Sequence, residues 1–583
     1  MSIKRYVLDT ETTIEEEPRV WSWEALEVGD VDHPIRGISI NGLIEWLAQA
    51  QKVVYIHNLK FDASYILSYL FQIGFEHTEE RTLNEGEFST LISDTGVYYV
   101  IDIRFENGVK CRLLDSYKII PMKVEDMAKA YGLEFRKLEI DYAKSRPVGY
   151  QPTEHEWSYQ HADVAILSLS LTHIFNAGLK RITQSSNAMT DYINMTGGKL
   201  FRKRFPELSV ELDRYCRNAY FGGSAQVGER FKGLFLGKGL VFDINSSYPW
   251  AMRYCLLPYG DPVYYEGKYV PDDRYPLYIA RFSCWFKLKK DHIPCVMGKH
   301  MSRFKYDKFL TDSRGEIVEM TLTSIDIALL FDQYEVKCVT WIDGYKFKGS
   351  KQLFKEYIDK WHKEKEQATI TGNKPMRSIA KDMMNKLSGK FGVKPKLWKK
   401  VPYYDGRIRY RLSDEADEPS HKGYVPVIAF ITAYGRDKII RGAQANFERF
   451  VYMDTDSLHL LGWEDPVGIE IDDVKLGAFK CENRFVQIKA LHAKCYIEEI
   501  LCDEKEKESL IGKEVKKEGD FKVYGDGYTY TKVTVAGLPA NCHEQVTFDN
   551  FKVGAVYTGK LRPDMTSNGI LLKETTFEIK DVD

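Results

Sequence analysis

Short apolar runs that end in acidic side chains recur along this chain. In the stretch ERFVYMDTDSLHLLGW, residues 448–463, one apolar run ends at Met453 and another starts at Leu458. Two such runs around a short polar centre predict a β-hairpin or a tight bend. Between them stand Asp454 and Asp456, and positions i and i+2 of an extended chain point to the same side. Carboxylates held side by side repel each other, so they need a cation or water around them. Taken alone, the stretch fits a solvated turn better than a metal site.

The first part of the chain shows the same arrangement twice more. The segment KRYVLDTETT predicts a strand that ends in Asp9 and Glu11, again two positions apart. An apolar run over residues 53–56 predicts a second strand, which is followed by Asp62 and the start of a helical pattern. Each motif alone fits a capping aspartate or a solvated turn.

A third segment adds a fourth carboxylate. The apolar spacing of HEWSYQHADVAILSLSLTHIF, residues 155–175, predicts a helix that carries Tyr159 and Asp163 one turn apart on one face. Together with Asp9, Glu11 and Asp62, this aspartate could hold two divalent cations. Oxygen ligands of this kind favour magnesium or manganese.

The second half of the chain supplies another acid and a basic helix. The segment LVFDINSSYPWAM predicts a strand that ends at Asp243, which is a candidate partner for Asp454 and Asp456. The stretch SIAKDMMNKLSGKFGVKPKLWKK, residues 378–400, predicts a helix that ends in glycines before a lysine-rich loop, with Arg377 and Lys381 about one turn apart. Basic side chains beside a metal site would neutralise an incoming triphosphate. A basic helix alone is more often a solvated face.

Composition narrows the class of protein. A chain of 583 residues is too long for one core, and three or four domains are expected. No run of about 18 apolar residues predicts a membrane span, and the N-terminus shows no apolar signal segment. Ten cysteines without a CxxC pair favour reduced thiols in a cytosol-like compartment over a zinc site or a disulfide framework. The formal net charge of −2 gives no global sign of a nucleic-acid partner, so binding would need local patches.

The N-terminal acids lie in a known pattern. DxE, then Nx3D, then Yx3D resembles the three motifs of the DnaQ-like 3′–5′ proofreading exonucleases of DNA polymerases. The resemblance implies that Asp9, Glu11, Asp62 and Asp163 bind metal and that Tyr159 orients the attacking water. Lys144 matches a lysine that contacts the scissile phosphate in one polymerase subgroup. The side chains that would grip the single-stranded 3′ end are His57, Asn58, Phe61, Ser116 and Tyr117. Phe61 and Tyr117 fit plain core packing equally well.

The second half resembles the family B DNA polymerases. Asp243 to Pro249 match motif A (DxxSxYP), Lys381 to Gly389 match motif B (Kx3Nx2xG), and Asp454 to Asp456 match motif C (DTD). Three further motifs match YxGG, Tx2GR and KxY, which would contact template and primer; their residues are Tyr220, Gly222, Gly223, Thr432, Arg436, Lys494 and Tyr496.

Two insertions, one before the motif B helix and one after it, match those of the protein-primed subgroup of family B. This resemblance implies a DNA-directed DNA polymerase that replicates a linear phage genome, protein-primed, processive and strand-displacing, with a 3′–5′ exonuclease. The expected fold class is α/β and α+β multidomain, a DnaQ-like (RNase H-like) exonuclease followed by a right-hand polymerase. The expected domains are the exonuclease (1–187), palm (188–255 and 424–528), first insertion (256–353), fingers (354–394), second insertion (395–423) and thumb (529–583).

The resemblance also implies roles within the polymerase site. Asp243 and Asp456 would bridge two Mg²⁺ ions, for which Mn²⁺ can substitute, and Asp454 would bind metal or support it. Lys381 and Arg377 would clamp the phosphates of the nucleotide. Tyr248 would exclude a 2′-hydroxyl group, although a buried aromatic explains it as well.

Motif B departs from the family in one position. Ser388 stands where the family usually has a tyrosine near the nascent base pair, and the smaller side chain leaves a void unless neighbours move in. We expect nucleotide selection to be loosened.

The expected partners are primer-template DNA, dNTPs, a terminal protein as primer, and phage single-stranded and double-stranded DNA-binding proteins. The protein would act as a monomer in the cytoplasm of a bacterial host, without membrane contact. Three alternatives stay open: a family B polymerase primed by nucleic acid alone, a nuclease with a degenerate polymerase half, and a non-catalytic DNA-binding scaffold.

Overall fold

The computed structural model describes residues 3–136, 138–301, 303–418, 423–511 and 518–581. Its N-terminal part is built on an eight-stranded sheet of order β3-β2-β1-β4-β8-β7-β6-β5, in which β1, β4 and β8 run parallel to one another. The strands are β1 (Lys4–Thr12), β2 (Val20–Glu27), β3 (Ile35–Gly37), β4 (Lys52–Ile56), β5 (Glu76–His77), β6 (Glu87–Ile92), β7 (Tyr98–Arg104) and β8 (Lys110–Asp115).

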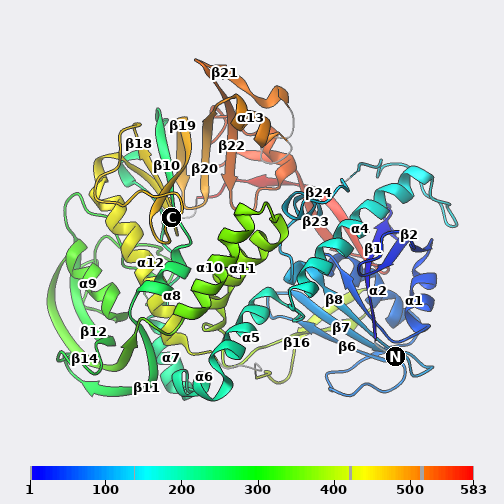
Figure 1. The fold of residues 1–583 in the computed structure, drawn as a ribbon, viewed down its shortest axis with the longest axis horizontal. Coiled ribbons are helices and arrows are strands. Elements are labelled where there is room, and N and C mark those ends of the chain that lie inside the picture. Colours follow the sequence, from blue (N-terminus) through cyan, green and yellow to red (C-terminus); the bar gives the residue numbers. More distant parts are fainter. Residues whose placement is uncertain (1–2, 137, 302, 419–422, 512–517, 582–583) are drawn as a thin grey trace.

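Helices cover both faces of this sheet, as the alternation of its strands requires. Leu8 and Val54 pack with α1 (Ile40–Ala48) and α2 (Lys60–Gln72), whereas Val7 and Tyr55 belong to the core beneath α3 (Val124–Tyr131) and α4 (Glu154–Asn176). Neighbouring positions of a strand face opposite sides, so one sheet anchors both layers. A short 3-10 turn, η1 (Ser116–Lys118), follows β8. Figure 1 shows this part in blue and cyan at the right.

A second eight-stranded sheet, of order β21-β22-β20-β19-β10-β18-β17-β9, forms the other large part of the molecule. Its central strand β10 lies between β18 and β19, which come from much later in the chain. The strands are β9 (Ala225–Val227), β10 (Gly239–Ile244), β17 (Phe450–Asp454), β18 (Ser457–Leu461), β19 (Phe479–His492), β20 (Cys495–Cys502), β21 (Lys522–Tyr524) and β22 (Gly527–Val535). The helices near it are α7 (Val210–Asn218), α8 (Ser247–Tyr254), α12 (Val425–Ala445) and α13 (Glu504–Leu510).

Three smaller units interrupt or extend this sheet. The first is a four-stranded sheet of order β11-β14-β12-β13 with α9, the second is the hairpin β15–β16, and the third is the hairpin β23–β24. Their bounds are β11 (Leu257–Glu266), β12 (Leu277–Leu288), β13 (Val318–Thr323), α9 (Ser324–Gln333), β14 (Tyr334–Ser350), β15 (Lys400–Tyr404), β16 (Ile408–Leu412), β23 (Val556–Met565) and β24 (Ile570–Glu578). The remaining 3-10 turns are η2 (Glu229–Phe231), η3 (Gly298–His300), η4 (Phe447–Arg449), η5 (Glu518–Asp520) and η6 (Ala540–Gln545).

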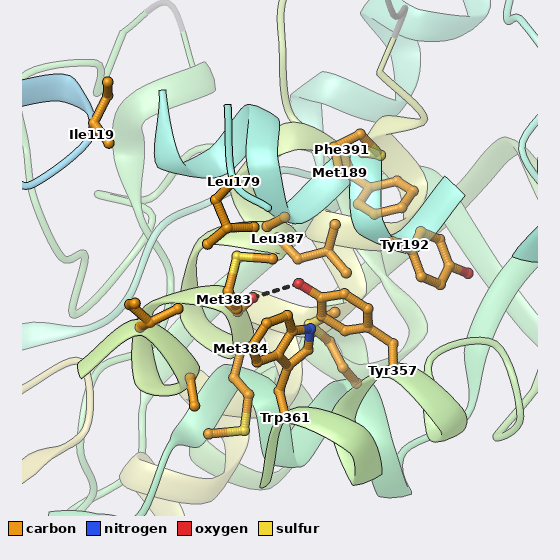
Figure 2. Packing of buried hydrophobic residues seen from close by; sticks show 14 of the residues in the cluster. Ile119, Leu179, Met189, Tyr192, Tyr357, Trp361, Met383, Met384, Leu387 and Phe391 are labelled. Carbon is orange, nitrogen blue, oxygen red and sulfur yellow. Dashed lines mark hydrogen bonds between the residues drawn. The ribbon is translucent and has the colours of Figure 1, made fainter. Parts of the chain in front are cut away.

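The helix pair α10 (Lys355–Ile370) and α11 (Lys374–Lys390) lies between the two large sheets (Figure 1). It packs on α5 (Gln184–Thr196), which precedes α6 (Gly198–Arg204). Figure 2 shows how Met189 of α5, Trp361 of α10 and Leu387 of α11 share one apolar core. The Tyr357 hydroxyl donates to the Met383 carbonyl oxygen over 2.8 Å, which joins α10 to α11 within that core (Figure 2).

The two small hairpins and the N-terminal part meet at one place. The Tyr65 hydroxyl of α2 donates to the carbonyl oxygen of Ile570 over 2.6 Å, and the Tyr404 hydroxyl of β15 reaches Ser567 O at 3.3 Å. Tyr98 of β7 and Tyr410 of β16 share a hydrogen bond between their hydroxyl groups. Each of these three units therefore contacts the other two, and we call this set of hydrogen bonds the ring of contacts.

The helices and strands predicted around the acidic motifs are confirmed, with one correction. Asp454 ends β17 and Asp456 follows a turn at Thr455, whose φ is +59°, so these two acids are not neighbours on an extended strand. Among the helices of the described residues, none combines the length and apolar character needed to cross a membrane.

Candidate active sites

The first acidic site consists of the carboxylates predicted from the N-terminal motifs. Helix α4 meets β1 where Gln160 Nε2 donates to the main-chain oxygen of Asp9 over 3.0 Å. Helix α2 is joined to the same strand by Thr10 Oγ1, which donates to Asp62 Oδ1 over 2.6 Å. The structure thus brings three separate segments together at one end of the sheet. The members of the site are Asp9, Glu11, Asp62 and Asp163.

A cavity of about 560 Å³ opens at this site, and Asp9 and Asp163 line it together. His57, Asn58 and Tyr117 line the same cavity, as does Lys123, which the sequence did not single out. The cavity therefore combines carboxylates with aromatic and basic side chains, which suits a polyanionic strand that carries bases.

Burial makes the charges of this site costly. Desolvation raises the pKa of Asp62 to about 7, although the hydrogen bond from Thr10 opposes the shift and the charge of Asp115 adds to it. Asp115 ends β8, next to β4, and sequence reasoning missed it because no motif marks it. A carboxylate that is hard to ionise when bare gains most from a nearby cation.

Tyr159 is held by a partner that the sequence did not reveal. Its hydroxyl lies 2.8 Å from that of Tyr142, and burial together with the charge of Glu11 raises its pKa, so that it stays protonated. Lys144 faces the start of α4 instead, where Nζ donates to the Tyr150 hydroxyl over 2.5 Å and lies 3.4 Å from Glu156 Oε1. A phosphate contact by Lys144 therefore stays a prediction.

Of the predicted single-strand residues, His57, Asn58 and Tyr117 line the cavity, whereas Phe61 and Ser116 are not among its lining residues. His57 Nδ1 lies 3.1 Å from Ser116 Oγ, and its ring meets that of Tyr117 edge-on at 5.3 Å between centroids. Ser116 is buried and supports His57, whereas Tyr117 is exposed. The Asn58 main-chain N–H donates to Asp115 Oδ1 over 3.1 Å, and Phe61 packs 5.6 Å from the ring of Tyr65.

The second acidic site, formed by Asp243, Asp454 and Asp456, lies at one end of the second sheet. Asp243 of β10 pairs with Ser457 of β18, and the main-chain N–H of Ile244 donates to the Asp456 carbonyl oxygen over 2.9 Å. The sheet therefore places acids from far apart in the sequence side by side.

Burial and neighbouring carboxylates raise the pKa values of Asp243 and Asp456. Burial, and then the charge of Asp456, raises the pKa of Asp243 to about 8; burial and the charge of Asp454 raise that of Asp456 to about 6. Glu482 of β19 raises both values, and Lys381 lowers both. Sequence reasoning missed Glu482, because only the pairing of β19 with β10 brings it to the site.

Asp454 is neutralised by a lysine of the KxY motif. Lys494 Nζ lies 2.6 Å from Asp454 Oδ2, and the Lys494 main-chain N–H donates to the Tyr452 hydroxyl over 2.9 Å. Tyr496 packs on Tyr452 with 4.7 Å between ring centroids. The two KxY residues thus support the strand that carries Asp454.

Basic side chains of the helix pair face these acids. Lys381 of α11 acts on both Asp243 and Asp456, as their pKa values show. Burial lowers the pKa of Lys365 on α10, and the charges of Arg377 and Lys381 add to that effect. Lys365, which the sequence did not single out, therefore belongs to the same cationic group.

Of the predicted nucleotide-binding residues, Tyr248 lies beside the second acidic site, where the charges of Asp456 and Asp454 act on it. Tyr248 of α8 is half-buried, and burial raises its pKa to about 12 against the opposing charge of Arg436. Ser388 of α11 is 2% exposed, and its Oγ lies 3.4 Å from the Asn385 carbonyl oxygen.

The YxGG segment packs against the turn of the second acidic site. The Thr455 main-chain N–H donates to the Ser224 carbonyl oxygen over 2.7 Å. Arg436 Nη1 donates to the carbonyl oxygens of Phe221 and Gly222, each over 2.7 Å, and its guanidinium pairs with Asp326. The Thr432 hydroxyl donates to the Ile428 carbonyl oxygen over 3.0 Å.

Thr432 and Arg436 are both 2% exposed, so the structure uses their polar atoms inside the protein. Their template contacts stay predictions, as do those of Tyr220, Gly222 and Gly223.

The donor chemistry of both acidic sites fits magnesium or manganese, because the available ligands are carboxylate oxygens. Within the described part of the chain, no three acidic, histidine or cysteine side chains already converge as a metal cluster. A divalent cation bound here would nevertheless relieve the repulsion that the charge of Asp456 exerts on Asp243.

A family model for DNA polymerase type B, organellar and viral, matches residues 46–151 and 139–473, so the chain belongs to that family. Full-length relatives are the DNA polymerases of Bacillus phage Nf, 38% identical over 100% of both chains, and of Bacillus phage phi29, 37% identical over 100% of both. The structure superposes on phi29 DNA polymerase with primer-template DNA at a TM-score of 0.91, with 36% identity, covering 99% of this chain and 100% of that one. The ternary complex of phi29 polymerase with incoming nucleotides matches with a TM-score of 0.90. The resemblance to phi29-type polymerases is therefore confirmed, and the molecule is a multidomain α/β protein of that kind.

Proposed function

We propose that this protein is a DNA-directed DNA polymerase with a 3′–5′ exonuclease. The observation that carries the proposal is that Asp243 and Asp456 lie together near Lys381. The charge of Lys381 lowers the pKa of both carboxylates. A scaffold protein has no need to bury repelling acids, whereas nucleotidyl transfer uses them to hold cations.

The residues of the second acidic site would divide the work of nucleotide addition. Asp243, Asp456 and Asp454 would hold two Mg²⁺ ions, or Mn²⁺ in their place, and these ions supply the charge that activates the primer 3′-hydroxyl and stabilises pyrophosphate. Lys381, Arg377 and Lys365 would bind the triphosphate, since Lys381 acts on Asp243 and Asp456 and the other two belong to the same cationic group. Tyr248 would exclude the 2′-hydroxyl group of a ribonucleotide. Lys494 and Tyr496 would hold the primer strand.

The first acidic site would remove misincorporated nucleotides. Asp9, Glu11, Asp62 and Asp163 would hold the cations, and Tyr159 would orient the attacking water through its protonated hydroxyl group. The frayed 3′ end would lie in the cavity beside His57, Asn58 and Tyr117, with Phe61 and Ser116 behind them.

The domain bounds expected from the sequence are part of the proposal, although the bound at 187/188 falls within α5 and the bound at 528/529 falls within β22. The first sheet and α4 would form the exonuclease (1–187), and the second sheet the palm (188–255 and 424–528). Helices α10 and α11 would form the fingers (354–394), and the last hairpin the thumb (529–583). The four-stranded sheet and the hairpin β15–β16 would be the two insertions (256–353 and 395–423).

Protein priming, strand displacement and processivity are part of the same proposal. The two inserted units support it, because they match in place and size those of the protein-primed subgroup of family B. The partners would be a terminal protein that offers a hydroxyl group as primer, primer-template DNA, dNTPs and phage DNA-binding proteins, in the cytoplasm of a bacterial host.

The test is extension of a 5′-labelled primer on a single-stranded circular template with Mg²⁺, with and without dNTPs. Wild type should extend past one circle, Asp456→Ala should only degrade the primer, and Asp9→Ala/Glu11→Ala should only extend it. Asp549→Ala, which changes an exposed aspartate outside both sites, should behave as wild type.

Each alternative function predicts a different pattern of products on the gel. Wild type that shortens the primer at every dNTP level would be a nuclease with a degenerate polymerase half. A protein that neither extends nor degrades would be a scaffold. Extension without nucleotidylation of any terminal protein would indicate priming by nucleic acid alone.

A further inference from the structure

Arg146 is a buried cation that the proposed chemistry does not use. Its side chain is 1% exposed and is among the largest fully buried side chains of the described residues. A charge taken out of water is costly unless it is paired and hydrogen-bonded. Its partners therefore show what it stabilises.

The guanidinium of Arg146 joins three segments. Nε and Nη2 donate to Glu156 Oε1 over 3.1 and 3.0 Å, which ties it to the first turn of α4. Nη2 also donates to the Asp141 carbonyl oxygen over 2.8 Å, and Nη1 to that of Lys144 over 3.2 Å. The plane of the guanidinium lies over the ring of Trp21 of β2, 4.3 Å from its centroid.

Glu156 is a fixed anchor for this cation. It closes the capping box of α4 with Thr153, whose N–H it accepts over 2.9 Å, and it accepts the Tyr150 hydroxyl over 2.6 Å. Burial raises its pKa, but the hydrogen bonds from Tyr150 and Thr153 outweigh that effect and lower the pKa to about 2. The carboxylate thus stays charged at any pH at which the protein would work.

The segment between the two bound carbonyl groups contains Tyr142. Its main chain is held on both sides, at Asp141 and at Lys144, and its hydroxyl lies 2.8 Å from that of Tyr159. Tyr159 stands three residues after Glu156 on α4, one turn further along the helix. Arg146 therefore connects both partners of the tyrosine pair, because it binds the segment that contains Tyr142 and the first turn of the helix that contains Tyr159.

We propose that Arg146 and Glu156 are positioning residues of the first acidic site, where their ion pair fixes the segment 141–144 on α4 and holds Tyr142 against Tyr159. The inference rests on the proposed exonuclease, since Tyr159 would orient the attacking water there. The position of the Tyr159 side chain then depends on a buried ion pair that contacts neither the substrate nor the four carboxylates of the site.

The test measures exonuclease kcat and KM on a single-stranded oligonucleotide for Arg146→Lys, Tyr142→Phe and the double variant. Arg146→Lys keeps the charge but loses the planar fork, and it should lower kcat by about tenfold or more while KM changes little. Tyr142→Phe should lower kcat similarly. The double variant should fall no further than the worse single variant, because both act through one contact. Primer extension by the same preparations should be unchanged.

Three controls keep the result decisive. Arg202→Lys changes an exposed arginine of α6 and should have no effect. Glu156→Gln, which keeps the volume but removes the charge, replaces Arg146→Lys if that variant fails to fold. The Asp9→Ala/Glu11→Ala variant gives the background rate of degradation in the assay.

The outcomes separate this inference from the proposed function. Losses that multiply in the double variant, or a parallel loss of primer extension, would show that the pair only stabilises the fold. Full exonuclease activity in Arg146→Lys would overturn the inference alone. A wild-type protein that degrades no faster than Asp9→Ala/Glu11→Ala would overturn the proposed exonuclease itself.

Discussion

Gly223 lies directly against Thr455, the residue at the turn between the two aspartates of the second acidic site. A Cβ atom on Gly223 would stand 2.5 Å from Thr455 Oγ1, closer than two such atoms approach in proteins. The turn of the DTD motif thus has its shape partly because a segment some 230 residues earlier offers no side chain there.

Gly223→Ala should therefore displace the DTD turn and lower primer extension by about tenfold or more, because small misplacements at a reacting centre are costly. Degradation of single strands should be retained. The matched control is Gly237→Ala, since a Cβ atom there meets nothing within 4 Å. Equal extension by the two variants would contradict the packing argument.

Asp243 should make stability depend on pH. Its pKa is raised to about 8, so the folded metal-free protein binds a proton that the unfolded chain releases near 3.8. The folded state then loses stability as pH rises between those values, and Asp243→Asn should weaken that loss. Mg²⁺ should raise the melting temperature by about 2 °C or more at pH 8.5 and less at pH 6, where protons compete for the site. Thermal melts with and without Mg²⁺ check this, with Asp549→Asn as the control.

Tyr248→Val should admit ribonucleotides. The smaller side chain removes the ring beside the second acidic site, and the preference for dNTPs over rNTPs should fall by about tenfold or more. Tyr248→Phe keeps the ring and should keep the preference. Single-nucleotide insertion kinetics measure the preference in both variants. Equal preference for dNTPs in Tyr248→Val and wild type would show that Tyr248 does not exclude ribonucleotides.

Ser388→Tyr should tighten nucleotide selection. The buried serine occupies a position where the family usually has a ring, and the larger side chain would refill that space. Misincorporation is measured in the Asp9→Ala/Glu11→Ala background, so that excision does not hide errors. A misincorporation rate in the parent no higher than that in the Ser388→Tyr variant would contradict this prediction.

Gly569→Val should open the ring of contacts. A Cβ atom on Gly569 would lie 2.4 Å from Tyr65 Cδ1, so the tip of the β23–β24 hairpin must move away from α2. We expect shorter products per binding event when a heparin trap is present, with the rate of single insertions unchanged. Gly519→Val, at a glycine with open space around it, is the control. Unchanged product length would show that the ring of contacts does not determine processivity.

The sequence predicted the elements that carry the acids because short apolar runs bounded by acids specify strands locally. It could not predict Glu482, which reaches Asp243 only through the pairing of β19 with β10. Tyr142 was hidden for a similar reason, because only the fold of its segment onto α4 brings it to Tyr159.

Arg436 shows the converse limit of sequence reasoning. Its motif predicts a template contact, but a sequence does not reveal that Asp326 and two carbonyl groups already occupy the guanidinium. Competition among partners for one side chain is settled only by tertiary packing.

The order of the two acidic sites along the chain has a consequence for synthesis. The four acids of the first site lie on elements that end with α4 at Asn176, whereas the second site needs β10 to pair with β18 and β19, the last of which ends at His492. A chain still emerging from the ribosome can thus assemble the first sheet and its acids while most of the second sheet has yet to be translated. The capacity to remove nucleotides would then mature before the capacity to add them, and a prematurely terminated product would be a nuclease without a polymerase.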